Sequence, residues 1–340
     1  MSLSTRLVAA WYAPHLTVLT TVLVPFAVAF AAIARMRRAL FRMGVLHALR
    51  LPVPVIVVGN ITVGGSGKTP LTAALTRALA ERGWRPGIVS RGHGRATTRS
   101  APMIVAPDAD ATEVGDEPLL LARTGIPVAV AADRVGAARA LLAAHPECNV
   151  IVADDGLQHY RLARDFEIVV VDAERGIGNG WRLPAGPLRE PVARLDEADA
   201  IVALATPGDS APWTVPNAWR MTLVGDTFRR VADPAQTQPA SVFTGPGVHA
   251  IAGIGNPERF FAQLRSLRIA PTVHPFPDHH RFTRRDLALP GARAILMTEK
   301  DAVKCAAFAD ERCWYLPVRA HIDPALVARV EEALRGSEAA

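Results

Sequence analysis

A short glycine-rich segment of this sequence has the residue types of a phosphate-binding loop. Residues 58–70 read VGNITVGGSGKTP, in which Gly67, Lys68 and Thr69 stand in the order that ends such a loop. The general pattern also places a glycine five residues before Gly67, and this chain has Thr62 there. The segment is therefore either a nucleotide site with an unusual first residue or an ordinary turn between a strand and a helix.

The remaining glycines favour the nucleotide site. Gly64 and Gly65 still permit a tight turn whose backbone N–H groups surround a β-phosphate. Lys68 would then reach the β and γ oxygens of ATP, and the Thr69 hydroxyl would bind Mg²⁺. The residues that we expect to hold the nucleotide are Gly64, Gly65, Ser66, Gly67, Lys68 and Thr69.

Acidic residues follow two apolar runs further along the chain. The run NVIVAD (149–154) leads directly into Asp155, which places Asp154 and Asp155 at the end of a predicted strand. One of the two would face the magnesium shell, directly or through water. Asp172, at the end of another apolar run, is the competing candidate. We prefer the Asp154–Asp155 pair because a polar Gln-His pair follows it closely.

Two further clusters carry titratable groups. Asp116 and Glu117 begin an apolar stretch, where an acidic residue often only caps a helix. Asp278, His279 and His280 stand together beside aromatic residues. Such a cluster is either structural or part of a site, and its residue types alone leave both interpretations open.

A loop rich in glycine and proline contains two arginines that suit phosphate binding. Residues 175–191, RGIGNGWRLPAGPLREP, include Arg182 and Arg189. The segment is either a surface loop or a lid that faces phosphate groups.

These candidate residues need a scaffold, and the sequence predicts one of alternating strands and helices. The run before the loop (53–60) is short, β-branched and apolar, and the segment after it (70–83) has helical periodicity. A second helix is expected over 133–145. The other expected strands are 87–90, 127–132, 149–154, 167–172 and 200–205. This order predicts a doubly wound, mostly parallel α/β sheet of the P-loop NTPase kind, with ligands at the carboxyl ends of the strands.

The charge distribution argues against nucleic acid as a partner. The chain has 340 residues and a formal net charge of +6. Residues 1–50 contain six arginines and no lysine, aspartate or glutamate, and the other 32 basic residues equal the 32 acidic ones. The basic excess therefore belongs to the N-terminus. The three cysteines form no C-x-x-C pair, which argues against a zinc site or a disulfide framework.

The N-terminal segment is predicted to attach the protein to a membrane. Residues 16–34 carry no charge, and four arginines follow within 35–42. The positive-inside rule places everything after Arg35 in the cytoplasm, with Trp11 and Tyr12 as interfacial aromatics at the other end. A half-inserted helix and a buried soluble helix are the alternatives, because Pro25 interrupts a stretch of marginal length.

The sequence thus divides into four predicted segments. They are a membrane-anchoring helix with its basic flank (1–45), a core around the phosphate loop (46–228), a polar, proline-rich linker (229–247) and a smaller α/β unit (248–340).

Several of these pieces together resemble the tetraacyldisaccharide 4′-kinases of lipid A biosynthesis. The family's loop is similar to VGNITVGGSGKTP, including a residue other than glycine at Thr62. Its other blocks are similar, in order, to SRGHG (90–94), GDEP (115–118), DDGLQH (154–159), LPAGPLREP (183–191), FPDHHRFT (276–283) and TEKDAVK (298–304). The family often has tyrosine where this chain has His93. The resemblance covers nearly the whole chain.

The resemblance implies transfer of the γ-phosphoryl group of ATP to the 4′-hydroxyl of a tetraacylated glucosamine disaccharide 1-phosphate. It implies that Asp116 is the catalytic carboxylate and that His279 is its partner. It also implies a location at the bacterial inner membrane, with the catalytic domains on the cytoplasmic side and the lipid A disaccharide precursor and inner-leaflet lipids as partners.

The other site residues follow from the same resemblance. Glu117, Asp154 and Asp155 would surround the metal with Thr69, and Arg189, or else Arg182, would neutralise the transferring phosphoryl group. A membrane-associated ATPase that drives a partner protein is the rival interpretation, because it would need the phosphate loop but neither Asp116 nor His279.

Overall fold

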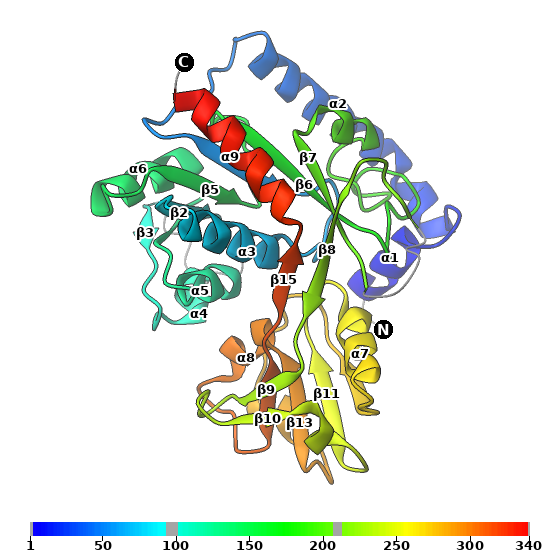
Figure 1. Cartoon of the computed structure of the whole chain (residues 1–340). Coiled ribbons are helices and arrows are strands. Elements are labelled where there is room, and N and C mark those ends of the chain that lie inside the picture. Colours follow the sequence, from blue (N-terminus) through cyan, green and yellow to red (C-terminus); the bar gives the residue numbers. More distant parts are fainter. Residues whose placement is uncertain (1–2, 93–100, 207–212, 339–340) are drawn as a thin grey trace.

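The computed structural model describes residues 3–92, 101–206 and 213–338, which form two α/β units and an N-terminal helical pair (Figure 1). The larger unit contains the nine-stranded sheet β15-β8-β7-β6-β1-β5-β2-β4-β3. Its strands are β1 (Val55–Gly59), β2 (Pro86–Ser90), β3 (Met103–Ile104), β4 (Val128–Val130), β5 (Val150–Asp154), β6 (Phe166–Asp172), β7 (Ala200–Leu204), β8 (Trp219–Val224) and β15 (Arg319–Ile322). Its helices are α3 (Lys68–Glu81), α4 (Ala111–Val114), α5 (Asp116–Ala122), α6 (Arg134–Ala144) and α9 (Pro324–Glu338).

The strands from β4 to β8 in the sheet order pair in parallel, and only β3 and β15, at the two edges, are antiparallel. Alternate side chains of β1 are apolar on both faces of the sheet, which explains why helices cover both faces. Ile56 and Val58 pack with α3 and α9, and Val55 and Val57 pack with α6. The predicted doubly wound sheet is confirmed, and each predicted strand begins and ends within two residues of its observed bounds.

The smaller unit contains the six-stranded sheet β10-β9-β14-β13-β11-β12. Its elements are β9 (Thr227–Arg230), β10 (Thr237–Pro239), β11 (Val248–Ala252), α7 (Pro257–Ser266), β12 (Thr272–Pro275), β13 (Ala294–Thr298), α8 (Glu299–Cys305) and β14 (Cys313–Leu316). Short 3-10 helices cover Ala240–Phe243 and Arg284–Leu287 in this unit and Val192–Glu197 in the larger unit. Phe228, Phe260 and Phe261 form part of a separate core in this unit.

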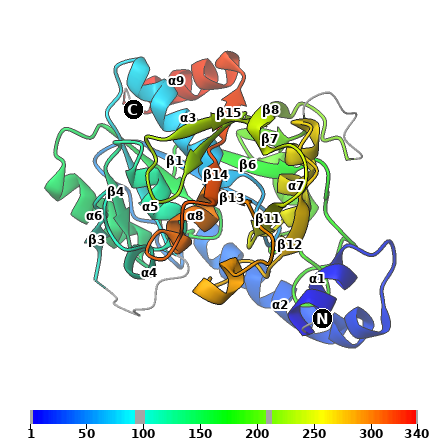
Figure 2. The same cartoon turned by 90° about the horizontal axis from the view of Figure 1, so that it is seen from below.

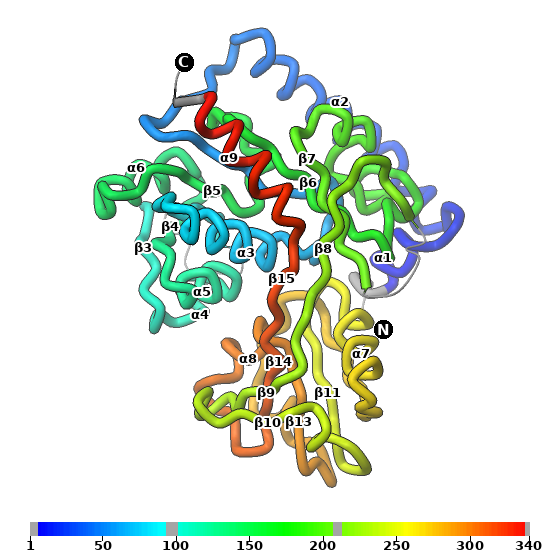
Figure 3. Tube along the Cα trace, viewed as in Figure 1, coloured from blue at the N-terminus to red at the C-terminus, as the bar shows by residue number. Residues whose placement is uncertain are grey.

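The structure corrects two of the predicted boundaries. The segment 229–247 is not a linker, because β9 and β10 form an antiparallel pair at the edge of the smaller sheet. An edge strand tolerates polar residues and proline, which gave this segment the composition of a linker. The last residues also leave the smaller unit: β15 pairs with β8, and α9 packs against α3. The Cα trace shows β8 and β15 running side by side toward the smaller unit (Figure 3).

The N-terminal helices α1 (Leu3–Trp11) and α2 (Val18–Arg42) lie together at one side of the molecule (Figure 2). By length and composition α2 can cross a membrane, and only 11% of its most apolar window is buried in the protein. The aromatic residues before it are not free for a membrane interface. Trp11 is 8% exposed and donates its indole N–H to the carbonyl oxygen of Pro184, and the Tyr12 ring lies 3.9 Å from the Arg175 guanidinium. These contacts fasten the helical pair to the larger unit.

Candidate active site

The glycine-rich loop connects the carboxyl end of the central strand β1 to the first turn of α3. Gly67 is the N-terminal cap of α3 with φ of 87°, and Gly64 has φ of 104°. A Cβ atom at Gly67 would lie 2.7 Å from the Leu204 side chain, so both the backbone conformation and the space require glycine. The helix N-terminus therefore points at the loop, as anion binding requires.

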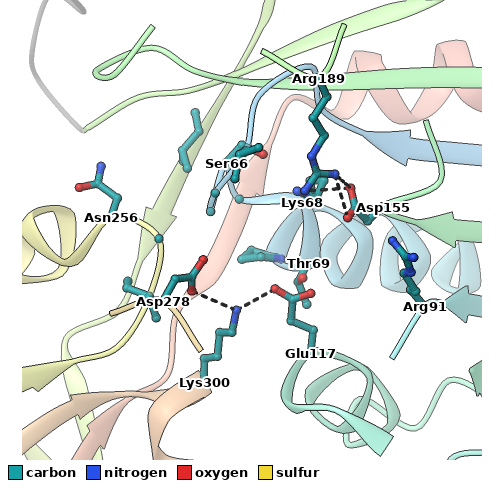
Figure 4. Close-up of a pocket in the computed structure, with 18 of the residues that line it drawn as sticks. Ser66, Lys68, Thr69, Arg91, Glu117, Asp155, Arg189, Asn256, Asp278 and Lys300 are labelled. Carbon is teal, nitrogen blue, oxygen red and sulfur yellow. Dashed lines mark hydrogen bonds and ion pairs between the residues drawn. The ribbon is translucent and has the colours of Figure 1, made fainter. Parts of the chain in front are cut away.

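Lys68, Asp155 and Arg189 form a charged cluster beside this loop (Figure 4). Lys68 Nζ lies 3.5 Å from Asp155 Oδ1, and Arg189 Nη1 donates to both carboxylate oxygens of Asp155 at 3.2 Å. Burial raises the pKa of Asp155, but the Lys68 and Arg189 charges outweigh it and hold the pKa well below its usual range. Asp155 thus positions the two cations that we expected to contact phosphate.

Asp154 is fully buried next to Asp155, and its environment suits an oxygen ligand of a cation. Its Oδ1 accepts a hydrogen bond from Thr72 at 3.0 Å, and its Oδ2 has no hydrogen-bond partner among the described residues. Burial, followed by the charges of Glu117 and Asp155, raises the pKa of Asp154 to about 7. A nearby divalent cation would lower that pKa and satisfy the buried oxygen.

The predicted magnesium ligands supply only hard oxygen atoms. Over the described ranges of the chain, no group of three or more histidine, cysteine, aspartate or glutamate side chains could hold a metal by itself. Thr69 and Glu117 lie near each other in the site (Figure 4), whereas Asp154 ends β5 and Asp155 follows it. These donors fit Mg²⁺, which typically takes one or two protein oxygens and completes its shell with phosphates and water.

Asp116 and His279 meet across the two units. Asp116 is the first residue of α5 and is 5% exposed, and its Oδ2 lies 3.4 Å from His279 Nδ1. Burial raises the pKa of Asp116, but the contact with His279 and the Lys300 charge reverse this and lower the pKa to about 2. Asp116 Oδ1 also accepts the N–H of Glu117 at 2.9 Å. The carboxylate therefore supports the helix start and holds the imidazole at the same time.

Lys300 is a site residue for which the sequence predicted no role. It lies at the N-terminus of α8, where its Nζ donates to Glu117 Oε1 at 2.9 Å and lies 3.9 Å from both Asp116 Oδ2 and Asp278 Oδ1. Figure 4 shows it between Asp278 and Glu117. Burial lowers its pKa, but the Glu117 and Asp116 charges raise it more strongly. Its place in the block TEKDAVK (298–304) was the available signal.

Two arginines connect the units near the loop. Arg175 donates to the carbonyl oxygen of Gly255 at 2.6 Å, and Arg259 of the smaller unit pairs with Asp172 and lies 3.5 Å from Glu174. Asp172, the competing candidate for the metal, is thus bound to Arg259. Asp155 is likewise bound to Lys68 and Arg189, so the preference for Asp154 and Asp155 stays a prediction.

A large cavity of about 1550 Å³ joins these groups. Its lining includes the loop residues, Glu117, Asp155, Arg189 and His279, and it extends to α2 and Arg182. The Arg182 side chain reaches α2 and not the phosphate loop. Its Nη1 donates to the Ala31 carbonyl oxygen at 3.3 Å. In the SRGHG block, residues 93 and 94 lie outside the described residues.

His159 of the DDGLQH block makes stability depend on pH. Burial and then the Arg134 charge lower the pKa of His159 from 6.5 to about 4. Between these values the unfolded chain binds a proton that the folded chain does not, so stability falls as the pH falls through this window. We expect His159→Gln to reduce the loss of Tm between pH 7 and pH 5 in thermal melts. His321→Gln, an exposed histidine on β15, is the control, and an unchanged pH slope in His159→Gln would contradict this prediction.

Comparisons with known proteins show the family of this chain. A family model described as tetraacyldisaccharide-1-P 4′-kinase (LpxK) matches residues 19–335. A tetraacyldisaccharide 4′-kinase of Azoarcus sp. (strain BH72) is 54% identical over 314 residues, which cover 92% of this chain and 91% of that protein. The protein of that name from Azotobacter vinelandii is 46% identical over 98% of both chains.

A solved structure has the same fold. The crystal structure of LpxK from Aquifex aeolicus in complex with ATP has a TM-score of 0.75 and 28% sequence identity to this chain, and the match covers 93% of this chain and 99% of that one. The resemblance of the sequence motifs is thereby confirmed: the chain belongs to the tetraacyldisaccharide-1-P 4′-kinase family.

Proposed function

We propose that this protein transfers the γ-phosphoryl group of ATP to the 4′-hydroxyl of a tetraacylated glucosamine disaccharide 1-phosphate. The observation that carries the proposal is the Asp116–His279 pair, because Asp116 contacts His279 and His279 lines the same cavity as the phosphate loop. An ATPase that only drives a partner protein needs no such pair.

One group of site residues acts on the transferring phosphoryl group, and another acts on the acceptor hydroxyl. Lys68 and Arg189 offset the negative charge of the transferring phosphoryl group. Thr69 and the carboxylates beside it would hold Mg²⁺, which neutralises the phosphate oxygens when it is bound. Because burial and its charged neighbours set the pKa of Asp116 to about 2, its carboxylate is a weak proton acceptor by itself. The His279 imidazole takes the hydroxyl proton, and Asp116 orients the ring and stabilises its charged form.

This activity is tested by incubating the purified protein with γ-labelled ATP, Mg²⁺ and the disaccharide 1-phosphate in non-ionic micelles. Labelled lipid is the expected product, with the label at the 4′ position. Release of labelled inorganic phosphate alone, at the same rate with and without the lipid, would support the ATPase interpretation instead.

We further propose that α2 holds the enzyme at the cytoplasmic face of the bacterial inner membrane, where the lipid acceptor lies. Exposed apolar side chains support this, because Val22, Phe26 and Ile33 are 66%, 63% and 62% exposed. The arginines at the end of α2 suit anionic headgroups, each contributing about 1 kcal/mol near the surface.

Replacing Val22, Phe26 and Ile33 together by serine should move the protein from the membrane to the soluble fraction. The contacts of Trp11 and Arg38 with the larger unit remain in this variant, so the nucleotide site should still bind ATP. The control replaces Val224, Val242 and Val273, which are exposed elsewhere, by serine. Sedimentation with membranes unchanged in the α2 variant would show that other surfaces hold the protein there.

A further inference from the structure

The main chain of His279 has an unfavourable conformation, so neighbouring groups must hold it in place. Its φ of 57° lies in the left-handed region, which is uncommon for residues other than glycine. Its backbone N–H donates to the Gly253 carbonyl oxygen at 3.2 Å and to Asp278 Oδ1 at 3.0 Å. Gly253 is buried and follows β11 directly. The Gly253 carbonyl is therefore the contact that joins His279 to the core of the smaller unit.

Gly253 is itself held by a buried carboxylate of the TEKDAVK block. Asp301, in the first turn of α8, is fully buried, and its Oδ2 accepts the Gly253 N–H at 3.0 Å. The start of α8 already has a cap in Thr298, whose hydroxyl oxygen accepts the Asp301 N–H at 3.1 Å. The Asp301 carboxylate thus reaches beyond its own helix to a peptide group 48 residues away.

Lys304 balances the buried charge of Asp301. Its Nζ lies 2.6 Å from Asp301 Oδ1 and donates to the Gly253 carbonyl oxygen at 3.4 Å. The same ammonium group lies 5.2 Å from the centre of the Phe282 ring. A buried ion pair by itself adds little stability, because desolvation of both charges offsets their attraction. What this pair does is to contact both polar atoms of the Gly253 backbone.

The segment 276–283, which contains His279, packs directly on Gly253. A Cβ atom at Gly253 would lie 3.2 Å from His280 Cβ and 3.2 Å from the Phe282 ring. The ring centres of Phe276 and His280 are 4.6 Å apart, and those of His280 and Phe282 are 4.8 Å apart. Because these side chains are close-packed, a displacement of Gly253 would also displace the His279 imidazole.

We propose that Asp301 is a positioning residue for the His279 imidazole, with Gly253 as the link between them and Lys304 as the counter-ion. The proposal rests on the proposed function, in which His279 takes the proton of the acceptor hydroxyl. Asp301 is fully buried and lies outside the cavity lining, so it acts on the rate only through His279. The effect can be large, because a misplacement of about 1 Å can cost on the order of 10²-fold in rate.

The test compares two variants that both carry Lys304→Met, so that neither leaves a buried ammonium without its carboxylate. With Asp301→Asn, the amide oxygen can still accept the Gly253 N–H, and kcat should stay within about threefold of the unmodified protein. With Asp301→Ala, that acceptor is lost, and kcat should fall about tenfold or more while the KM of ATP stays within about twofold. The control is Asp310→Ala, which removes a different ion pair of the smaller unit, with Arg312 at 2.7 Å.

A second comparison separates positioning from support of the fold. In a protein that carries His279→Asn there is no imidazole to position. Adding Asp301→Ala and Lys304→Met to that protein should therefore lower the remaining formation of labelled lipid by less than about twofold. A residue that only stabilises the fold would cause the same fold-loss in both proteins. Thermal melts show which variants are folded at the assay temperature. If the alanine variant is not, Asp301→Leu with Lys304→Met takes its place, because leucine fills the space without supplying an acceptor.

Three results would overturn the proposal. They are an unchanged kcat in the folded alanine or leucine variant, an equal loss with and without His279, and an asparagine variant that loses as much activity as the alanine variant. If the unmodified protein does not form labelled lipid at all, the proposed function itself fails, so the two failures are distinguishable.

Discussion

Lys68→Met is expected to lower kcat/KM on the order of 10²–10³-fold, the loss typical of removing one group that stabilises charge in a transition state. Methionine keeps the apolar stem of the lysine and removes only the ammonium group. Lys68 Nζ is the cation of α3 that lies 3.5 Å from Asp155 at the start of the helix. No other part of the proposed mechanism supplies a positive charge from this position.

The folded state should tolerate this change. Asp155 keeps both hydrogen bonds from Arg189 at 3.2 Å, so the carboxylate is not left buried and unpaired. Steady-state kinetics and a thermal melt of the same preparation measure the two effects separately. A folded variant with near-normal turnover would show that the phosphate loop has no part in the reaction. A Tm much lower than that of the unmodified protein would show that Lys68 mainly stabilises the fold.

Much of the larger unit could be predicted from the sequence because its signals are local. The central strands β1, β2 and β5 are short, fully buried and rich in β-branched residues, and they end at a glycine, a serine and an aspartate. The phosphate loop lies between such a strand and a helix, and all its residues are adjacent in the chain. Parallel strands that are buried on both faces need no long-range information to be identified.

One boundary error, at 229–247, comes from the polar and proline-containing composition of an edge strand, and the other comes from strand pairing that is not local. β15 pairs with β8 across about a hundred residues of sequence, and no residue in Arg319–Ile322 reveals that partner. Composition was also misleading for the N-terminus. Trp11 has the residue type of an interfacial anchor, and only the fold brings the Pro184 carbonyl oxygen to its indole.

The contacts within the candidate active site also could not be predicted from local sequence patterns. Asp116 and His279 are 163 positions apart, and their pairing was implied by the family resemblance and not by spacing. Lys300 and Arg259 come from the smaller unit, so their roles depend on how the two units meet. A sequence pattern identifies groups that lie on one element, whereas contacts between units require the structure.

Asp116→Asn separates the two roles that the structure assigns to this carboxylate. The asparagine amide oxygen can still accept the N–H of Glu117, which the aspartate accepts at 2.9 Å, so the start of α5 should be preserved. What is lost is the negative charge 3.4 Å from His279 Nδ1. We expect kcat to fall on the order of 10²-fold or more, the usual contribution of a positioned acid–base group. The affinity for ATP should change little, because neither residue is assigned to the phosphates.

The partner variant must respect the backbone of His279, whose φ is 57°. His279→Asn is preferred to alanine because asparagine tolerates this left-handed conformation. If Asp116 and His279 act as one unit, the double variant should lose much less activity than the product of the two single losses. Multiplicative losses would show that the residues act independently. A lower Tm in Asp116→Ala, together with unchanged kcat in Asp116→Asn, would leave Asp116 as a helix cap, with a cost of about 0.5–2 kcal/mol.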